Sequence, residues 1–505
     1  MSTLIDALSG AHAAHESRPW PRRVVDSDLW RDLACQLGDG LLTLAGLWGD
    51  AGMVHMALLD ATRGELAIAS LACEGGKFPS VGVYHAPAIR LERAIQDLFG
   101  YEPVGAPDPR PWLDHGRWPV LAPLGARTPS PATVAPYAFL TAEGEGLHQI
   151  PVGPVHAGTI EPGHFRFHAS GETIVRLEVR LGYTHKGVEA QMAGASLDRA
   201  ARLAARTSGD STVAYSIAFS RAVESALGVE VAGRGIWLRA LMAELERIAN
   251  HLGDIGAICN DASFALMHAH TGVLRERVLR AAHACFGHRL MMDVVAPGGT
   301  NADLTSSGLA LVRELMANIR DAFPALVELY DNTTSLQDRT VGTGVLRPEL
   351  ARQYGCGGFV GRASGRSFDA RRDFAYAPYD QLEFETPVLV GAGDVNARVW
   401  IRIREIQQSL RLLDQILDRM PSGEIRAEVA GAGELREGLA LVEGFRGDIL
   451  AWVRLGADGG VERCHLRDPS WFQWPLLEAA IEGNIVADFP ICNKSFNCSY
   501  SGHDL

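Results

Sequence analysis

The sequence predicts an α+β protein, in which a small N-terminal α/β domain precedes a large, mainly helical domain with peripheral β-hairpins. Short apolar runs separated by polar breaks dominate residues 1–125, a pattern typical of strands and short helices in a small α/β unit. Long segments with helical spacing of apolar residues dominate the chain after residue 153. The length of 505 residues is enough for two or three hydrophobic cores.

Within the N-terminal part, three apolar runs and one helix are expected. The runs cover residues 41–47, 54–59 and 65–71, and residues 91–99 have the apolar spacing of a helix. Prolines and glycines break the pattern after residue 100. Residues 126–152 are rich in proline, alanine and threonine and are expected to be a linker.

The C-terminal part is expected to begin with a hairpin that turns at Ser170-Gly171 and to continue with helices. Residues 422–468 look β-rich, and a short helix over 474–481 should lead into an irregular tail. The predicted helices cover residues 197–227, with a break near 208–209, and 235–258, 271–292, 307–329 and 399–417.

Composition excludes several classes of protein. Apolar residues make up 47% and charged residues 21% of the chain, as in ordinary globular proteins. The net charge of −13 argues against nucleic acid as a partner. No two of the eight cysteines have C-x-x-C spacing, which argues against a zinc ribbon or a self-contained iron–sulfur site. No apolar run reaches the roughly 20 residues that span a bilayer.

Five segments, in order, resemble one protein family over nearly the whole chain. The stretch LERAIQDLFG followed by PDPR resembles the 30-kDa-type subunit of complex I. The segments GPVHAGTIEPGHFRF and RLGYTHKGVE resemble the start of the large subunit of energy-converting nickel–iron hydrogenases. The segments AVESALGVEV and LMAELERIANHLGDIG resemble helices shared by those large subunits and the 49-kDa-type subunit of complex I. RASGRSFDARRDFAYAPYDQLEFETPV and IVADFPICNKSFNCSYS complete the series.

This resemblance implies a fused arrangement like that of formate hydrogenlyase-type large subunits. Residues 1–125 correspond to the 30-kDa-type domain, and residues 153–505 correspond to the hydrogenase large-subunit or 49-kDa-type domain. The partners implied are an iron–sulfur small subunit of the complex I 20-kDa type, a ferredoxin-like cluster subunit and antiporter-like subunits of a membrane arm. The cluster is expected in a partner, so no cofactor is expected in this chain. The implied location is peripheral, on the cytoplasmic face of the inner membrane.

The chain departs from the family at the four cysteines that hold a nickel–iron centre. The family pattern R-x-C-G-x-C aligns with Arg206 to Ser211, where Ser208 and Ser211 replace both cysteines. The late pattern C-x-x-C aligns with Cys498 and Ser501, so one cysteine of four remains. A serine hydroxyl is a hard donor and is protonated at neutral pH, whereas the two metals need bridging thiolates. We therefore expect no metal site and no hydrogenase activity.

The same residues allow other uses of the cavity. Arg206, Ser208, Asp210 and Ser211 are expected to form a small polar pocket, with Cys498 as a packed cysteine or a single redox thiol. In complex I, a tyrosine and a hairpin histidine hold the quinone head. Tyr215 and His164 are the candidates here, although the hairpin follows the hydrogenase pattern.

Two carboxylates are the candidates for proton transfer. Glu161 resembles the glutamate that passes protons from the metal site in hydrogenases, and Glu189 resembles a family glutamate near the centre. Buried carboxylates are costly unless they are paired or used. The structural alternative is pairing with a nearby base, for which Arg180, Lys186 and Arg206 are the candidates.

Three hypotheses follow. The first is a subunit of a complex I-like respiratory assembly, without a nickel–iron site, that couples electron transfer from a partner cluster to proton or ion movement or serves as a scaffold. The second is a reductase of quinone or another small acceptor in the remodelled cavity. The third is a purely structural subunit. The sequence leaves open whether the chain has an NADH-quinone oxidoreductase-like or other activity of its own.

Overall fold

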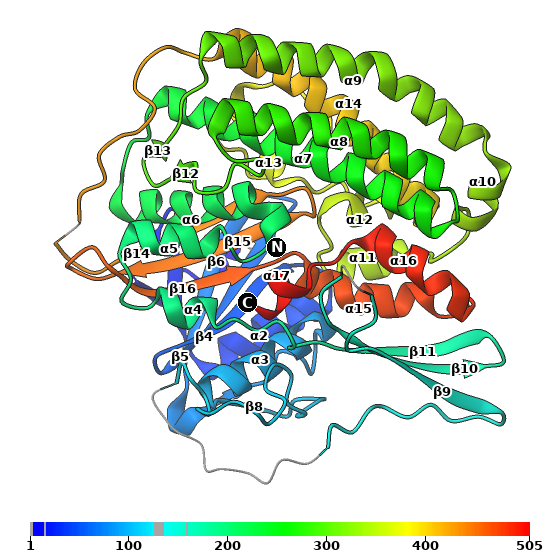
Figure 1. Ribbon diagram of the computed structural model, residues 1–505. Coiled ribbons are helices and arrows are strands. Elements are labelled where there is room, and N and C mark those ends of the chain that lie inside the picture. The colour runs from blue at the N-terminus through cyan, green and yellow to red at the C-terminus, as the bar shows by residue number, and fades with distance from the viewer. Residues whose placement is uncertain (1–3, 15–16, 126–135, 158–159, 432) are drawn as a thin grey trace.

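The N-terminal part is built on a five-stranded sheet in the order β1-β3-β6-β5-β4. The computed structural model describes residues 4–14, 17–125, 136–157, 160–431 and 433–505 (Figure 1). Neighbouring strands of this sheet are antiparallel, except for the parallel pair β3 and β6. The three predicted apolar runs are confirmed as β4, β5 and β6. The strands are β1 His12–Ala14, β3 Arg22–Val25, β4 Thr43–Asp50, β5 Met53–Asp60 and β6 Glu65–Ala72.

Two helices cover this sheet, and local chemistry sets their ends. α2 (Ser27–Gly38) begins where the side chain of Asp26 accepts the N–H groups of Asp28 and Leu29, a typical N-cap. α3 (Ile89–Phe99) ends at Gly100, whose φ of 71° is the left-handed conformation of a helix C-cap. The helix predicted over residues 91–99 is therefore confirmed.

A second sheet, in the order β16-β15-β14-β2, packs against the first. Its short strand β2 (Ser17–Arg18) comes from the N-terminal part and runs parallel to β14. Trp48 of the first sheet and Trp452 of the second lie 5.7 Å apart between ring centroids. The two sheets thus share a core that joins the two parts of the chain. The other strands are β14 Arg436–Glu443, β15 Asp448–Leu455 and β16 Val461–Arg467.

Helix α6 (Thr212–Leu227) covers β14 and β15. The contact is close because Gly438 has no side chain: a Cβ there would lie 1.9 Å from the carbonyl oxygen of Ala222. The second sheet is therefore covered on both faces, and β14 and β15 are buried along nearly their whole length.

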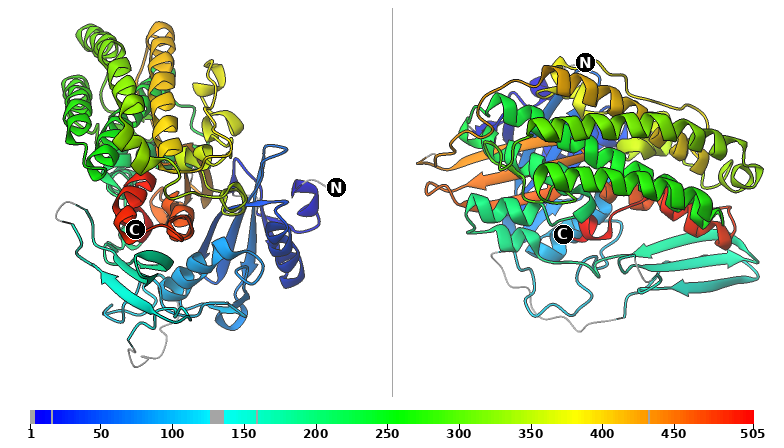
Figure 2. Two further views of the ribbon diagram at one scale, coloured as in Figure 1. Left: turned by 90° about the vertical axis from the view of Figure 1, so that its right-hand side faces the viewer. Right: turned by 45° about the horizontal axis from the view of Figure 1, so that its top comes forward.

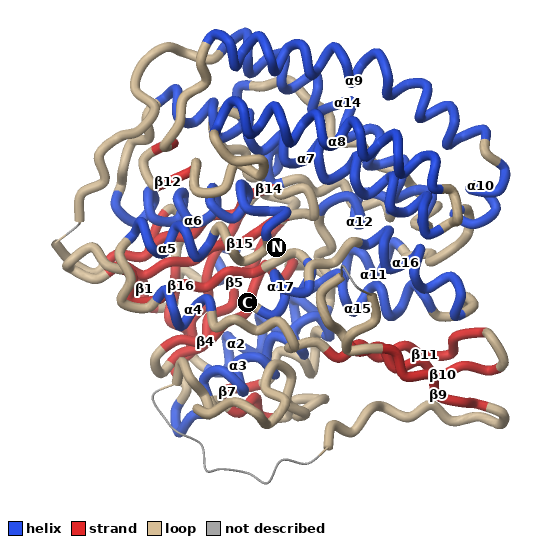
Figure 3. Tube along the Cα trace, in the orientation of Figure 1, coloured by secondary structure: helices blue, strands red, loops and turns tan. Residues whose placement is uncertain are grey.

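Four long helices form a bundle above this layer, as Figures 1 and 2 show. The bundle confirms three of the predicted helices, and α7 lies against both α8 and α14. Figure 3 shows the helices gathered on one side and the two packed sheets beside them. The prediction for α8 ran too far, because Gly287, with φ 79°, ends this helix after Phe286. The helices are α7 Gly233–Asp261, α8 Ala265–Phe286, α9 Ser306–Asn332 and α14 Val395–Arg419.

Two predictions for the irregular segments were wrong. Residues 147–152, assigned to the linker, form β9, which pairs with β10 (His164–Ser170), while β10 also pairs with β11 (Thr173–Arg180). Residues 126–135 of the linker lie outside the described residues. The helix predicted over 474–481 is confirmed as α15 Ser470–Ile481, but the tail after it is buried and helical, with α16 Phe489–Phe496 and α17 Tyr500–Asp504.

Among the described residues, none of the helices combines the length and the hydropathy needed to cross a bilayer.

Short elements complete the fold. The short elements are α1 Leu4–Ala7, β7 Lys77–Pro79, β8 Glu102–Val104, α4 Val188–Met192, α5 Leu197–Ala204, β12 Val295–Ala296, β13 Gly299–Thr300, α10 Thr334–Thr340, α11 Pro348–Gln353, α12 Gly358–Ala363 and α13 Ala370–Asp373.

Candidate functional site

The turn between α5 and α6 brings three of the predicted site residues together. Ser208 Oγ donates to Asp210 Oδ1 at 2.7 Å and lies 3.0 Å from Ser499 Oγ, just after Cys498. The two segments in which the resemblance would place metal ligands, near residues 208–211 and 498–501, are therefore in contact. Here the contact is made by hydroxyl groups.

Arg446, in the turn between β14 and β15, is the centre of this cluster, although no motif in the sequence marks it. Its Nη1 donates to Asp210 Oδ1 at 2.8 Å and to Ser211 Oγ at 3.1 Å, and its Nε donates to the carbonyl of Asn497 at 2.6 Å. Burial disfavours charge on Asp210, but the guanidinium of Arg446 and its hydrogen bonds outweigh burial and lower the pKa of this carboxyl. We call Ser208, Asp210, Ser211, Arg446 and Ser499 the arginine cluster.

Tyr215 lies one turn further along α6 and is fully buried. Its hydroxyl donates to Asp468 Oδ2 at 2.5 Å, and Asp468 also accepts the N–H of Ser470 at 2.8 Å. Burial and the carboxylate of Asp468 raise the pKa of Tyr215 well above its usual value. The phenol is therefore engaged within the protein and is not presented to a ligand.

Cys498 is buried beside the arginine cluster. Burial raises the pKa of its thiol well above the usual value, although Arg446 acts in the opposite direction. The thiol is therefore protonated at neutral pH. A protonated thiol is a poor nucleophile and a poor metal ligand, which favours its interpretation as a packed cysteine.

Glu161 lies next to the segment that follows Cys498. Its Oε2 accepts the N–H of Ser501 at 3.1 Å, and the residue is exposed. His156, from the same loop, lies 3.2 Å from the hydroxyl of Tyr500. His164 makes its polar contacts within its own hairpin, to the carbonyl of Gly153 and to Arg166. The structure thus places Glu161 beside the site, but the contacts of His164 do not join it to the arginine cluster.

Glu189 and Arg206 have other partners than expected. Glu189 contacts β16, where its carboxylate binds Arg463 at 2.7 Å and His465 at 2.8 Å. Burial would raise the pKa of Glu189, but these partners lower it to about 2. The side chain of Arg206 forms an exposed ion pair with Asp293. These contacts correct both predictions, because the side chains of Glu189 and Arg206 bind partners outside the arginine cluster.

Glu246 on α7 is a second residue that was not predicted for the site, although it lies in the family-like segment LMAELERIANHLGDIG. Its carboxyl accepts the N–H groups of Val213 at 2.7 Å and Ala214 at 3.1 Å, at the start of α6. Burial raises the pKa of Glu246 to about 8, although these N–H groups act in the opposite direction. Glu246 and Asp210 both line a cavity of about 20 Å³, which is room for about one water molecule.

Comparison with known proteins places these residues in a family. Residues 264–434 match the model of the respiratory-chain NADH dehydrogenase 49-kDa subunit. The chain is 32% identical to formate hydrogenlyase subunit 5 of Escherichia coli K12, over 85% of this chain and 77% of the relative. It is 32% identical to hydrogenase-4 component G of the same organism, over 85% and 76%. It is 29% identical to the C/D fusion of NADH-quinone oxidoreductase from Phocaeicola vulgatus, over 83% and 86%.

The chain belongs to the family of complex I 49-kDa-type subunits and hydrogenase large subunits. The fused C/D relatives match the arrangement in which a 30-kDa-type domain comes first. The members that are similar to this chain are subunits of complex I-like and hydrogenase-related membrane complexes.

The residues of this family member do not fit a nickel–iron centre. Ser208, Ser211 and Ser501 carry hydroxyls where the resemblance would place cysteines, and the guanidinium of Arg446 binds both Asp210 and Ser211. A fixed cation beside the hydroxyls opposes binding of a second cation by electrostatic repulsion. In the part of the chain that the structure describes, no group of three or more His, Cys, Asp or Glu side chains is arranged to hold a metal ion.

Proposed function

We propose that this chain is a subunit of a membrane-associated, complex I-like assembly that couples electron transfer from a partner iron–sulfur subunit to proton or ion movement, without a nickel–iron site of its own. The observation that supports it is the arginine cluster, in which Arg446 binds Asp210 and Ser211 where the resemblance would place metal-ligating cysteines. The rest of the family scaffold is present around this cluster.

The partners proposed follow from the family. They are a cluster-bearing small subunit of the complex I 20-kDa type, a ferredoxin-like cluster subunit and antiporter-like membrane subunits, with this chain peripheral on the cytoplasmic face. A quinone at Tyr215 is less well supported, because its hydroxyl is already donated to Asp468. A purely structural role is the remaining alternative, and the Glu161→Gln variant distinguishes it from coupling.

Metal analysis of the purified assembly tests the proposal. After growth with excess nickel, we expect substoichiometric nickel per chain and no hydrogen-dependent dye reduction, because three hydroxyls replace thiolates. A nickel–iron hydrogenase purified in the same way is the positive control. One nickel per chain together with hydrogenase activity would contradict the proposal.

Glu161→Gln separates coupling from scaffolding. The substitution keeps an acceptor for the N–H of Ser501 but removes the titratable group, so we expect a severalfold loss of proton movement per electron in an assembled complex. The matched control is Glu172→Gln, an exposed glutamate of the β10–β11 turn. Proton pumping by inverted membrane vesicles is the measurement. Unchanged pumping in an assembled Glu161→Gln complex would support a purely structural role instead.

A further inference from the structure

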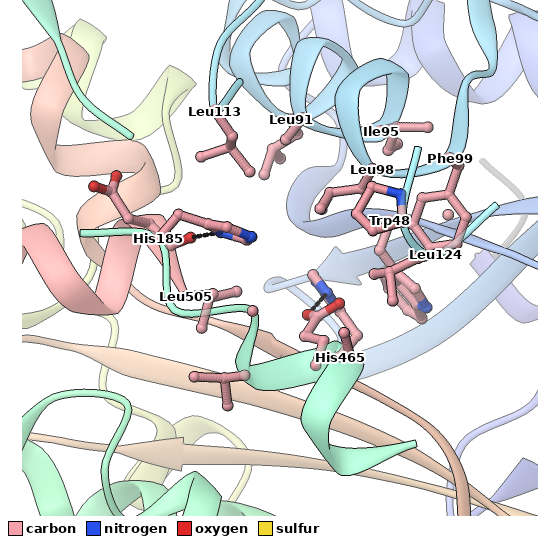
Figure 4. Close-up of a pocket in the computed structure, with 18 of the residues that line it drawn as sticks. Trp48, Leu91, Ile95, Leu98, Phe99, Leu113, Leu124, His185, His465 and Leu505 are labelled. Carbon is pink, nitrogen blue, oxygen red and sulfur yellow. Dashed lines mark hydrogen bonds and ion pairs between the residues drawn. The ribbon is translucent and has the colours of Figure 1, made fainter. Parts of the chain in front are cut away.

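A larger cavity, of about 120 Å³, lies between the two domains. None of the residues of the arginine cluster lines it. Its walls are mostly apolar side chains from β4, from α3 and from the segment that follows α3. Figure 4 shows them surrounding one open space. We call it the junction cavity, and its main apolar residues are Trp48, Leu91, Ile95, Leu98, Phe99 and Leu124.

One edge of the junction cavity is polar and is formed by Glu189, Arg463 and His465. The Nδ1 atom of His465 lies 2.8 Å from Glu189, and the ring stacks on Trp48 with 5.0 Å between centroids. His465 is 8% exposed. Neither its Nε2 atom nor the Nε atom of Arg463 has a hydrogen-bond partner among the described residues, although both atoms are buried.

Charge fixes the tautomer of His465. The permanent charge of Arg463, which binds Glu189 at 2.7 Å, keeps the carboxylate ionised, so Nδ1 of His465 carries the proton that faces it. Burial lowers the pKa of His465, although Glu189 acts in the opposite direction. In the neutral ring, Nε2 is then a hydrogen-bond acceptor, while Nε of Arg463 is a donor.

Buried donors and acceptors are usually hydrogen-bonded in native proteins, because leaving one without a partner costs its desolvation free energy. A hydroxyl group satisfies both, since it donates one hydrogen bond and accepts others. A carboxylate has no proton for Nε2 and would lie beside the charge of Glu189. The volume of the junction cavity also limits the size of the ligand, because a cavity of about 150 Å³ with apolar walls holds one benzene ring.

We propose that the junction cavity binds a small phenol-type molecule. Its ring lies against Trp48, Ile95 and Leu98, and its hydroxyl donates to Nε2 of His465 and accepts from Nε of Arg463. This site is independent of the coupling role proposed above, since it uses no residue of the arginine cluster.

Phenol and toluene, measured by titration calorimetry on the purified full-length chain, test the proposal. The two molecules have nearly the same shape, but only phenol has the hydroxyl. We expect phenol to bind about tenfold more tightly, as two modest hydrogen bonds predict. A purely apolar cavity gives the reverse order, because the hydroxyl must lose its hydration. Equal or tighter binding of toluene, or no binding of phenol, would overturn the proposal.

Two variants locate the binding. Leu98 is half-buried at the cavity, so Leu98→Trp should fill the space and abolish phenol binding without disturbing the fold. The matched control is Leu309→Trp, at a half-buried leucine of α9 outside the cavity, which should bind phenol normally. His465→Phe should reverse the preference to toluene. Normal phenol binding by Leu98→Trp, or its loss in Leu309→Trp, would place the binding elsewhere and overturn the proposal.

Discussion

Replacing Arg446 by methionine is expected to lower the free energy of unfolding by about 2–3 kcal/mol. The substitution keeps an unbranched, apolar stem but leaves the carboxylate of Asp210 and the carbonyl of Asn497 without their partner. Removing one partner of a fully buried ion pair costs about 3–5 kcal/mol. The expected loss is smaller because the side chain of Asp210 is 36% exposed, so that water screens part of its charge.

Two further variants make this test specific. The double variant Arg446→Met, Asp210→Asn should recover much of the loss, because it removes the stranded charge. Arg206→Met is the matched control, since Arg206 pairs with Asp293 at the surface, with side chains 46% and 38% exposed. It should cost less than about 1 kcal/mol. Chemical denaturation is the measurement, and equal losses in Arg446→Met and Arg206→Met would contradict the structural role of the cluster.

Relative to a Glu246→Gln variant, the stability of the natural protein is expected to fall as the pH rises from about 5 to about 8. The carboxyl of Glu246 keeps its proton in the folded protein up to a pKa of about 8, whereas its ordinary value is 4.5. The unfolded chain therefore binds fewer protons in this range, so stability decreases with pH. A pKa shift of this size corresponds to a loss of unfolding free energy on the order of 4 kcal/mol as the pH rises from about 5 to about 8.

The difference in unfolding free energy between the two proteins, measured at several pH values, tests this. The contribution of Glu246 should be fully present below pH 4.5 and lost as the pH passes 8. Glu314→Gln, at an exposed glutamate of α9, is the control and should show no such slope. A constant difference between natural protein and Glu246→Gln over the whole range would show that the carboxyl is ionised throughout.

Apolar runs and helical periodicity predicted the elements that build the core. The strands β4, β5 and β6 are short apolar runs between polar breaks, and the helices α7, α9 and α14 have apolar residues at helical spacing. The C-terminal tail was missed, since α16 and α17 are short and buried on most sides and leave no polar face in the sequence. The strand β9 was missed because its residues alternate weakly, with half of them exposed at the edge of a three-stranded sheet.

The candidate site was predictable only where a motif marks it. The serines at 208 and 211 were visible because they replace cysteines in a recognisable pattern. Arg446 lies 236 residues from Asp210 in sequence, in a turn without a motif, so only the fold reveals the pair. Glu189 was assigned to the centre from its motif, but a motif fixes a backbone position and not the direction of a side chain. In the structure it points to Arg463 and His465 of β16.

The arginine cluster connects two segments that lie far apart in the sequence. Ser208 and Ser499 are in contact, while Arg446 binds Asp210 and the carbonyl of Asn497. Charge-assisted hydrogen bonds of this kind are stronger than neutral ones. We propose that this ion pair and its hydrogen bonds connect the segments in which the resemblance to hydrogenase large subunits would place the metal ligands.

A density map of the purified assembly, resolved well enough to show side chains around residues 208–211 and 498–501, is the most direct test of this account. We expect continuous density from Arg446 to Asp210 and Ser211, with Ser208 in contact with Ser499. Strong density for two metal atoms between Cys498 and the serines, with Arg446 turned away from Asp210, would contradict it.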